Sequence, residues 1–81
     1  MKVTVKLFAA VRDIVDQCEV MLELEDHATL EMLRAKMSEK YPPLRPLLPQ
    51  TLFAVNAQYV PDSTPLEENS DIAMIPPVSG G

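Results

Sequence analysis

Residues 72–81 read IAMIPPVSGG, in which a strand pattern leads directly into a proline pair and a glycine end. The chain contains two glycines in all, Gly80 and Gly81. Glycine has no Cβ, so a Gly-Gly end stays extended in a channel too narrow for other residues. Proline cannot donate a ladder hydrogen bond, so Pro76-Pro77 ends the strand and stiffens the chain just beyond it. We expect residues 1–81 to form one domain that presents the α-carboxylate of Gly81.

Residues 76–81, called the tail below, are long enough to enter a buried pocket of another protein. The four residues from Val78 to Gly81 reach roughly 13–14 Å when fully extended. The stiff proline pair lowers the entropy lost on insertion. The sequence therefore predicts that the whole tail inserts into a partner, with these members: Pro76, Pro77, Val78, Ser79, Gly80 and Gly81.

Composition describes a single small globular domain. Of its 81 residues, 47% are apolar and 23% charged, and the net charge is −5. No cluster of Lys and Arg is present to neutralise phosphates, so we expect no nucleic-acid partner. The first residues alternate and no apolar run is long enough to span a bilayer, so we expect neither a signal peptide nor a membrane partner. These features favour a cytoplasmic protein.

The chain's single cysteine and single histidine give little sign of chemistry. Cys18 alone excludes an internal disulfide, and we interpret it as a small apolar residue rather than a nucleophile. His27 has no Cys, His or paired carboxylate at ligand spacing, so we expect a solvated loop histidine and no metal site.

Alternation of apolar and polar residues indicates four strands and a short return strand. We expect them at residues 2–8, 18–25, 52–56, 59–60 and 72–75. Asn56 is expected to adopt a positive φ in the hairpin between the third and the return strand. Residues 69–71, Asn-Ser-Asp, are expected to turn the chain into the last strand without a glycine.

Apolar residues at helical spacing predict two helices. The first covers residues 9–16, with Ala10, Val11, Ile14 and Val15 facing inward. The main helix begins after Thr29, whose hydroxyl suits an N-cap, and ends at Pro42-Pro43. Its inward stripe is Leu30, Leu33, Met37 and Tyr41. We expect the leucines of residues 42–49 to pin that proline-rich connection onto the core, and Met21, Met32, Met37 and Met74 to fill the core or its margin.

This order of elements predicts an α+β fold with the main helix packed on one face of a mixed sheet. In a β-grasp arrangement, the first and last strands lie side by side and parallel at the centre. Phe8, Tyr59 and Ile75 are apolar at positions that alternation turns outward. Because exposed apolar residues that cluster mark a partner surface, we expect these three to dock a partner on the face away from the helix, beside the tail.

Three stretches, LFAAVRD at 7–13, FAVN at 53–56 and the ending at 72–81, resemble the molybdopterin synthase small subunits, which are ubiquitin-like β-grasp sulfur carriers. The resemblance covers the whole chain. It implies that an adenylating enzyme uses ATP to join Gly81 to AMP, and that sulfur then replaces the adenylate to leave a thiocarboxylate, 1-thioglycine. It further implies that a large subunit, in an assembly of two small and two large subunits, passes this sulfur to a cyclic pyranopterin precursor. The chain itself would bind no cofactor and would not be catalytic.

Three alternatives stay open. A carrier for thiamine thiazole synthesis shares the Gly-Gly end, but such chains usually lack the helical insertion at residues 9–16 and the Pro-Pro before the tail. A ubiquitin-like protein modifier would bond Gly81 to a lysine amine, which gives large adducts. A passive interaction domain would tolerate loss of Gly81.

Overall fold

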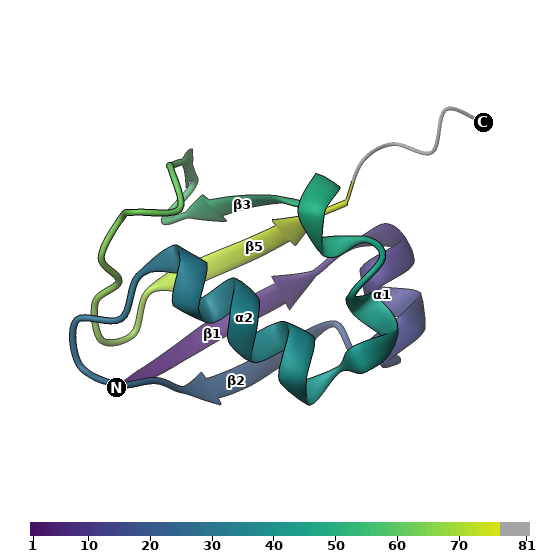
Figure 1. The fold of residues 1–81 in the computed structure, drawn as a ribbon, viewed down its shortest axis with the longest axis horizontal. Helices are drawn as coiled ribbons and strands as arrows, with labels where there is room; N and C mark the ends of the chain where they lie inside the picture. Colours follow the sequence, from purple (N-terminus) through teal and green to yellow (C-terminus); the bar gives the residue numbers. More distant parts are fainter. Residues whose placement is uncertain (77–81) are drawn as a thin grey trace.

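A computed structural model describes residues 1–76 as a mixed five-stranded sheet with one long helix across one face (Figure 1). Its strands are β1 (Lys2–Leu7), β2 (Glu19–Glu23), β3 (Leu52–Val55), β4 (Gln58–Tyr59) and β5 (Asp71–Ile75). Its helices are α1 (Ala9–Val15), α2 (Leu30–Lys40) and two single 3₁₀ turns, η1 (Pro42–Leu44) and η2 (Leu48–Gln50).

The sheet has the strand order β2-β1-β5-β3-β4. The central pair, β1 and β5, is parallel, with Val5 opposite Ile72, and the other three pairs are antiparallel. The predicted β-grasp arrangement, with the first and last strands adjacent at the centre, is confirmed.

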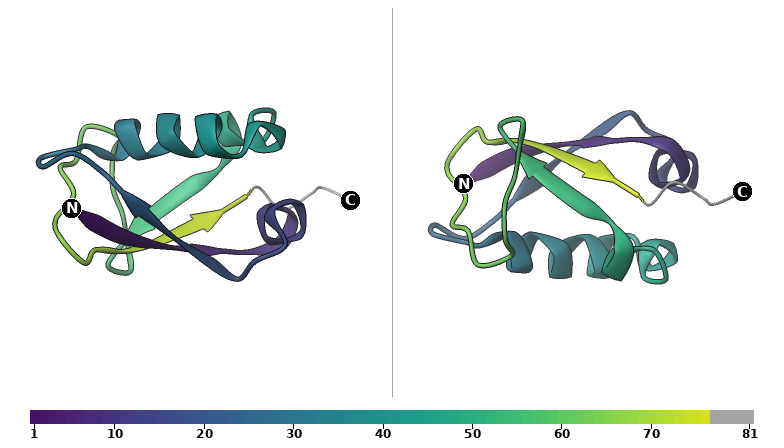
Figure 2. Two further views of the ribbon diagram at one scale, coloured as in Figure 1. Left: turned by 90° about the horizontal axis from the view of Figure 1, so that it is seen from below. Right: turned by 90° about the horizontal axis from the view of Figure 1, so that it is seen from above.

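One face of the sheet packs on α2 to form the core (Figure 2). The inward stripe of α2 is buried at Leu30, Leu33 and Met37, as predicted, and Tyr41 is half-buried. Thr29 caps this helix, since its hydroxyl oxygen accepts a hydrogen bond from the Met32 N–H at 3.4 Å. The sheet supplies alternate residues of its two central strands: Val3, Val5, Leu7, Ile72 and Met74.

Arg34 ties the proline-rich connection and the 61–65 loop to α2. Its guanidinium donates two hydrogen bonds to the Asp62 carboxylate, at 3.1 and 3.2 Å, and others to the backbone carbonyls of Leu48 and Thr51. It also lies 4.6 Å from the centre of the Phe53 ring. A half-buried guanidinium with carbonyl, carboxylate and aromatic partners holds those segments in one geometry.

Three apolar residues that were expected in the core or at its margin are exposed, namely Met21, Met32 and Ile14. Met21 is 62% exposed because it belongs to the face of β2 that points away from α2, and Met32 is 44% exposed because it lies on the outer side of α2. Ile14 is exposed because α1 buries Val11 alone, and Cys18 is exposed just before β2. The predictions for Met21, Met32 and Ile14 were therefore wrong, whereas the interpretation of Cys18 as a residue other than a nucleophile stays a prediction. Ala10 is exposed as well.

Along residues 1–76 no helix is both long and apolar enough to cross a membrane.

Substitutions at two neighbouring positions of α2, one buried and one exposed, test how this helix packs on the core. Leu33→Ala is expected to lower the free energy of unfolding by about 2–5 kcal/mol, because Leu33 is fully buried and its truncation leaves a cavity. Met32→Ala, the matched control on the exposed side, is expected to change it by less than about 0.5 kcal/mol. Urea unfolding followed by circular dichroism measures both. Equal losses at the two positions would contradict the orientation of α2.

Candidate functional site

The tail begins at the end of the most interior strand. β5 lies between β1 and β3, and its last residue, Ile75, is opposite Leu52 at the start of β3. Pro76, the next residue, is buried, which fixes where the chain leaves the sheet. The other predicted tail residues, Pro77, Val78, Ser79, Gly80 and Gly81, lie outside the described residues.

The face of the sheet opposite α2 has an apolar hollow that extends from the β3–β4 turn to Ile75, the last residue of β5. No other element of residues 1–76 crosses this face (Figure 2). The lining residues, called the apolar patch below, come from β5, β3, β4, the β3–β4 turn and the residue after β1: Phe8, Ala54, Ala57, Tyr59, Ala73 and Ile75. Phe8 and Tyr59, at 44% and 65% exposure, are the open rim of the hollow. The structure thus brings together the three residues predicted to dock a partner, Phe8, Tyr59 and Ile75.

Cross-strand register explains why this surface is hollowed. Ala54 stands directly opposite Ala73 on one side and Tyr59 on the other. Directly opposed residues point to the same face, so two short methyl side chains form a floor between larger neighbours. The sequence reasoning missed these alanines. Alternation along β5 could have indicated them. Ala73 lies two residues before Ile75 and therefore points to the same face, and Ala54 is its cross-strand partner.

The β3–β4 turn sets the position of Tyr59. Asn56 and Ala57 both have positive φ, 50° and 71°, the pattern that a two-residue hairpin turn requires. Asn56 also binds the start of β5: its side-chain oxygen accepts from the Asp71 N–H at 3.0 Å, and its own N–H donates to the Asp71 carbonyl at 2.8 Å. The predicted positive φ of Asn56 is confirmed. The turn is thereby tied to the strand that leads to the tail.

Beyond the apolar patch the same face becomes charged. Lys6 stands opposite Ala73, and its Nζ lies 3.5 Å from Oδ2 of Asp71. Both side chains are about half exposed, so this ion pair contributes little to stability. It marks the polar boundary of the patch.

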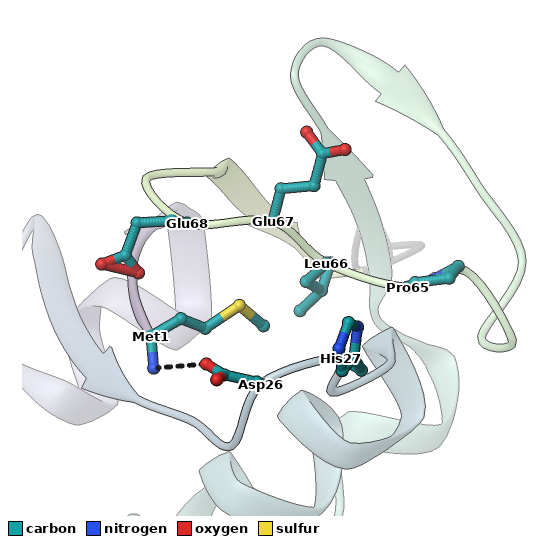
Figure 3. Close-up of a pocket in the computed structure, with 7 residues that line it drawn as sticks. All are labelled: Met1, Asp26, His27, Pro65, Leu66, Glu67 and Glu68. Carbon is teal, nitrogen blue, oxygen red and sulfur yellow. Dashed lines mark ion pairs between the residues drawn. The ribbon is translucent and has the colours of Figure 1, made fainter.

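A second hollow is lined by His27 and Met1, and its described side chains do not form a metal-binding or catalytic cluster (Figure 3). The Met1 amino group lies 3.8 Å from Asp26, whereas the Glu67 carboxylate points away from both Asp26 and His27. Within residues 1–76 no three His, Cys, Asp or Glu side chains are grouped so as to hold a metal ion. Asp26, Glu67 and Glu68 are exposed, and Glu68 accepts a hydrogen bond from the Lys2 N–H at 2.6 Å.

A mixed sheet with a parallel centre, one helix across one face and an apolar patch where the last strand ends defines a ubiquitin-like β-grasp protein. Comparison with known proteins gives the family. Residues 5–81 match the ThiS family, and the chain belongs to that family.

Relatives and solved structures agree with this placement. A molybdopterin synthase sulfur carrier subunit from Chlamydomonas reinhardtii is 35% identical over 83 residues, which cover 100% of both chains. One from Dictyostelium discoideum is 36% identical over 78 residues, which cover 93% of this chain and 91% of the relative. A chain in the complex of subunits 1 and 2 of the molybdopterin-converting factor from Helicobacter pylori matches with a TM-score of 0.74 and 29% identity, over 100% of both chains.

The hairpin geometry can be tested at Ala57. A Cβ at positive φ is sterically unfavourable, so Ala57→Gly is expected to raise the free energy of unfolding by up to about 1 kcal/mol. Ala73→Gly, the control in the central strand, is expected to lower it by about 0.5–1 kcal/mol. Thermal unfolding compares them. A less stable Ala57→Gly protein would show that this turn is built differently.

Proposed function

We propose that the chain is the sulfur-carrier small subunit of molybdopterin synthase and works in the cytoplasm. The observation that carries the proposal is the shared position of Ile75, which lines the apolar patch and ends the strand that leads through Pro76 to the Gly-Gly end. A partner that covers the patch therefore also meets the base of the tail. The full-length likeness to sulfur carrier subunits from two organisms supports it.

The reacting group of the proposal is the carboxylate of Gly81. A carboxylate is a poor electrophile, so an adenylating enzyme of the E1 kind first joins it to the α-phosphorus of ATP with release of pyrophosphate. A sulfur nucleophile then displaces AMP and leaves a thiocarboxylate, 1-thioglycine, at Gly81. In the large subunit this sulfur attacks a carbon of the cyclic pyranopterin precursor, and an oxygen substituent of that carbon leaves as the C–S bond forms. Water then cleaves the acyl–sulfur bond, which restores the carboxylate of Gly81 and leaves the sulfur on the precursor. The nucleotide is bound by the activating partner, and this chain binds no cofactor of its own.

The described residues of the chain serve as handle and docking surface in this scheme. The apolar patch sets large exposed side chains around a floor of alanines, a shape that accepts an apolar projection from a partner. We propose that Phe8, Tyr59 and Ile75 contact the large subunit, that the tail from Pro76 to Gly80 lies in its channel, and that two such pairs form a heterotetramer. The chain is then a substrate of one enzyme and a non-catalytic subunit of another.

Removal of Gly81 tests the carrier step. The shortened chain still ends in a glycine carboxylate but reaches about 3.5 Å less far. With the adenylating enzyme, ATP, sulfide, the large subunit and the precursor present, it is expected to form no dithiolene, whereas the full chain does. Met32→Ala, which leaves the tail and the apolar patch unchanged, is the control and is expected to stay active. Dithiolene formation by the shortened chain at the full-length rate would refute the proposal.

Charge placed on the patch tests docking separately. Tyr59→Asp and Ile75→Asp are expected to weaken binding to the large subunit by at least about tenfold, because a carboxylate is desolvated without a partner in an apolar contact. Met21→Asp places the same charge at an exposed apolar position on the same face outside the patch, and is expected to bind normally. Calorimetric titration measures all three. Equal affinities would place the interface elsewhere.

A further inference from the structure

The sheet has one long unprotected edge. β4, at one end of the strand order, has two residues, whereas β2, at the other end, has five. Figure 1 shows β2 along the outer margin of the sheet, next to α2. Short edge strands offer little to an incoming strand, so β2 is the edge at which strand addition is possible.

Register identifies which backbone groups of β2 are free. Met1 and Leu24 exchange hydrogen bonds with each other, and the Leu7 N–H donates to the Cys18 carbonyl. Hydrogen-bonded pairs alternate along an antiparallel ladder, so Val20 and Leu22 direct their backbone groups toward β1. The backbone N–H and C=O groups of Glu19, Met21 and Glu23 then point outward, and within residues 1–76 they have no backbone partner outside the sheet ladder.

A groove runs beside this edge on the side of α2. Two hollows that share Glu23, Lys36 and Glu39 form it, so they are continuous. Its α2 wall contains residues at helical spacing, all exposed: Met32, Ala35, Lys36 and Glu39. Leu22 and Leu24 of the β2 side are buried beneath it. A strand added to β2 would direct alternate side chains into this groove and onto the open face.

The negative charge of Glu19 and Glu23 on this edge favours the addition of a basic strand. Glu19 and Glu23, which flank Met21 on the open face, stand opposite Lys6 and Lys2 of β1. The outer side of each glutamate has no such partner within residues 1–76. Cross-strand pairs of opposite charge stabilise a sheet, so an added strand fits with Lys or Arg two residues on either side of an apolar residue. The groove itself carries both signs of charge: Glu39 and Lys36 line both hollows, Glu25 lines one of them and Lys40 the other. The preference for a basic strand therefore rests on Glu19 and Glu23 of the edge.

A second copy of this chain does not fit the same edge. Antiparallel pairing of two β2 strands about Met21 places Glu19 of each opposite Glu23 of the other. Like charges directly opposite destabilise a sheet. The acidic edge thus opposes self-association.

We propose that the β2 edge and its groove bind an extended basic segment of a partner protein by strand addition. The segment alternates basic and apolar residues on the open face, basic against Glu19 and Glu23 and apolar against Met21. It places small apolar residues in the groove against Ala28, Met32 and Ala35. This site is separate from the apolar patch and does not depend on sulfur transfer.

The probe is a peptide with the sequence Gly-Lys-Val-Leu-Val-Lys-Gly, acetylated and amidated, which has the same pattern in either strand direction. On titration into the full chain, amide NMR shifts are expected to change over residues 19–24 and 32–39, and exchange of the Met21 and Glu23 amides is expected to slow. The same peptide with Glu in place of Lys is expected not to bind.

Two changes test the backbone contacts themselves. Met21→Pro removes an N–H that points off the sheet, a position where an edge strand tolerates proline, and is expected to weaken binding about tenfold. Met21→Ala, which keeps that N–H, is the matched control and is expected to lose less affinity for the peptide. A peptide N-methylated at its three central residues is expected not to bind to the unchanged protein, a result independent of how Met21→Pro folds.

Several outcomes would overturn the proposal. They are an absence of saturable shifts, shifts confined to the apolar patch, undiminished binding of the N-methylated peptide, and a concentration-dependent dimer whose shifts map to β2.

Discussion

The parallel pairing of β1 and β5 is the constraint on which the rest of this structure depends. Val5 and Ile72 stand opposite each other, both fully buried, although they lie near opposite ends of the sequence. The last strand of the chain is therefore among the innermost, held between β1 and β3. Any movement of β5 breaks two ladders at once, so the next residue, Pro76, leaves the sheet at a defined place.

That constraint joins the two faces of the sheet. Ile72 and Met74 of β5 point into the core under α2, whereas Ala73 and Ile75 point to the open face. Each core contact that fixes β5 therefore also fixes the apolar patch and the start of the tail relative to each other. Such rigidity suits a carrier, because its reacting end must reach the same depth in every partner that it meets.

Much of this arrangement is predictable because its causes are local. Alternation identified β5, the Thr29 cap and the spacing of Leu33 and Met37 identified α2, and the outward aromatic Tyr59 indicated the patch. The contacts of Arg34 were not predictable, because Asp62 lies 28 residues away and no periodic pattern links them. The burial of Met21 was also predicted wrongly, because an apolar side chain does not by itself show whether it faces the core or the exposed face of an edge strand.

The fold alone does not separate a sulfur carrier from a protein modifier, since both present a glycine end on a β-grasp domain. The distinction lies in what becomes bonded to Gly81. Its most direct measurement is the intact mass of the protein after incubation with the adenylating enzyme, ATP and sulfide, combined with fragmentation from the C-terminal end. A sulfur carrier is expected to gain about 16 Da, sulfur for oxygen, located on Gly81. An unchanged mass at Gly81, or a lysine-linked adduct of much larger mass, would contradict this expectation.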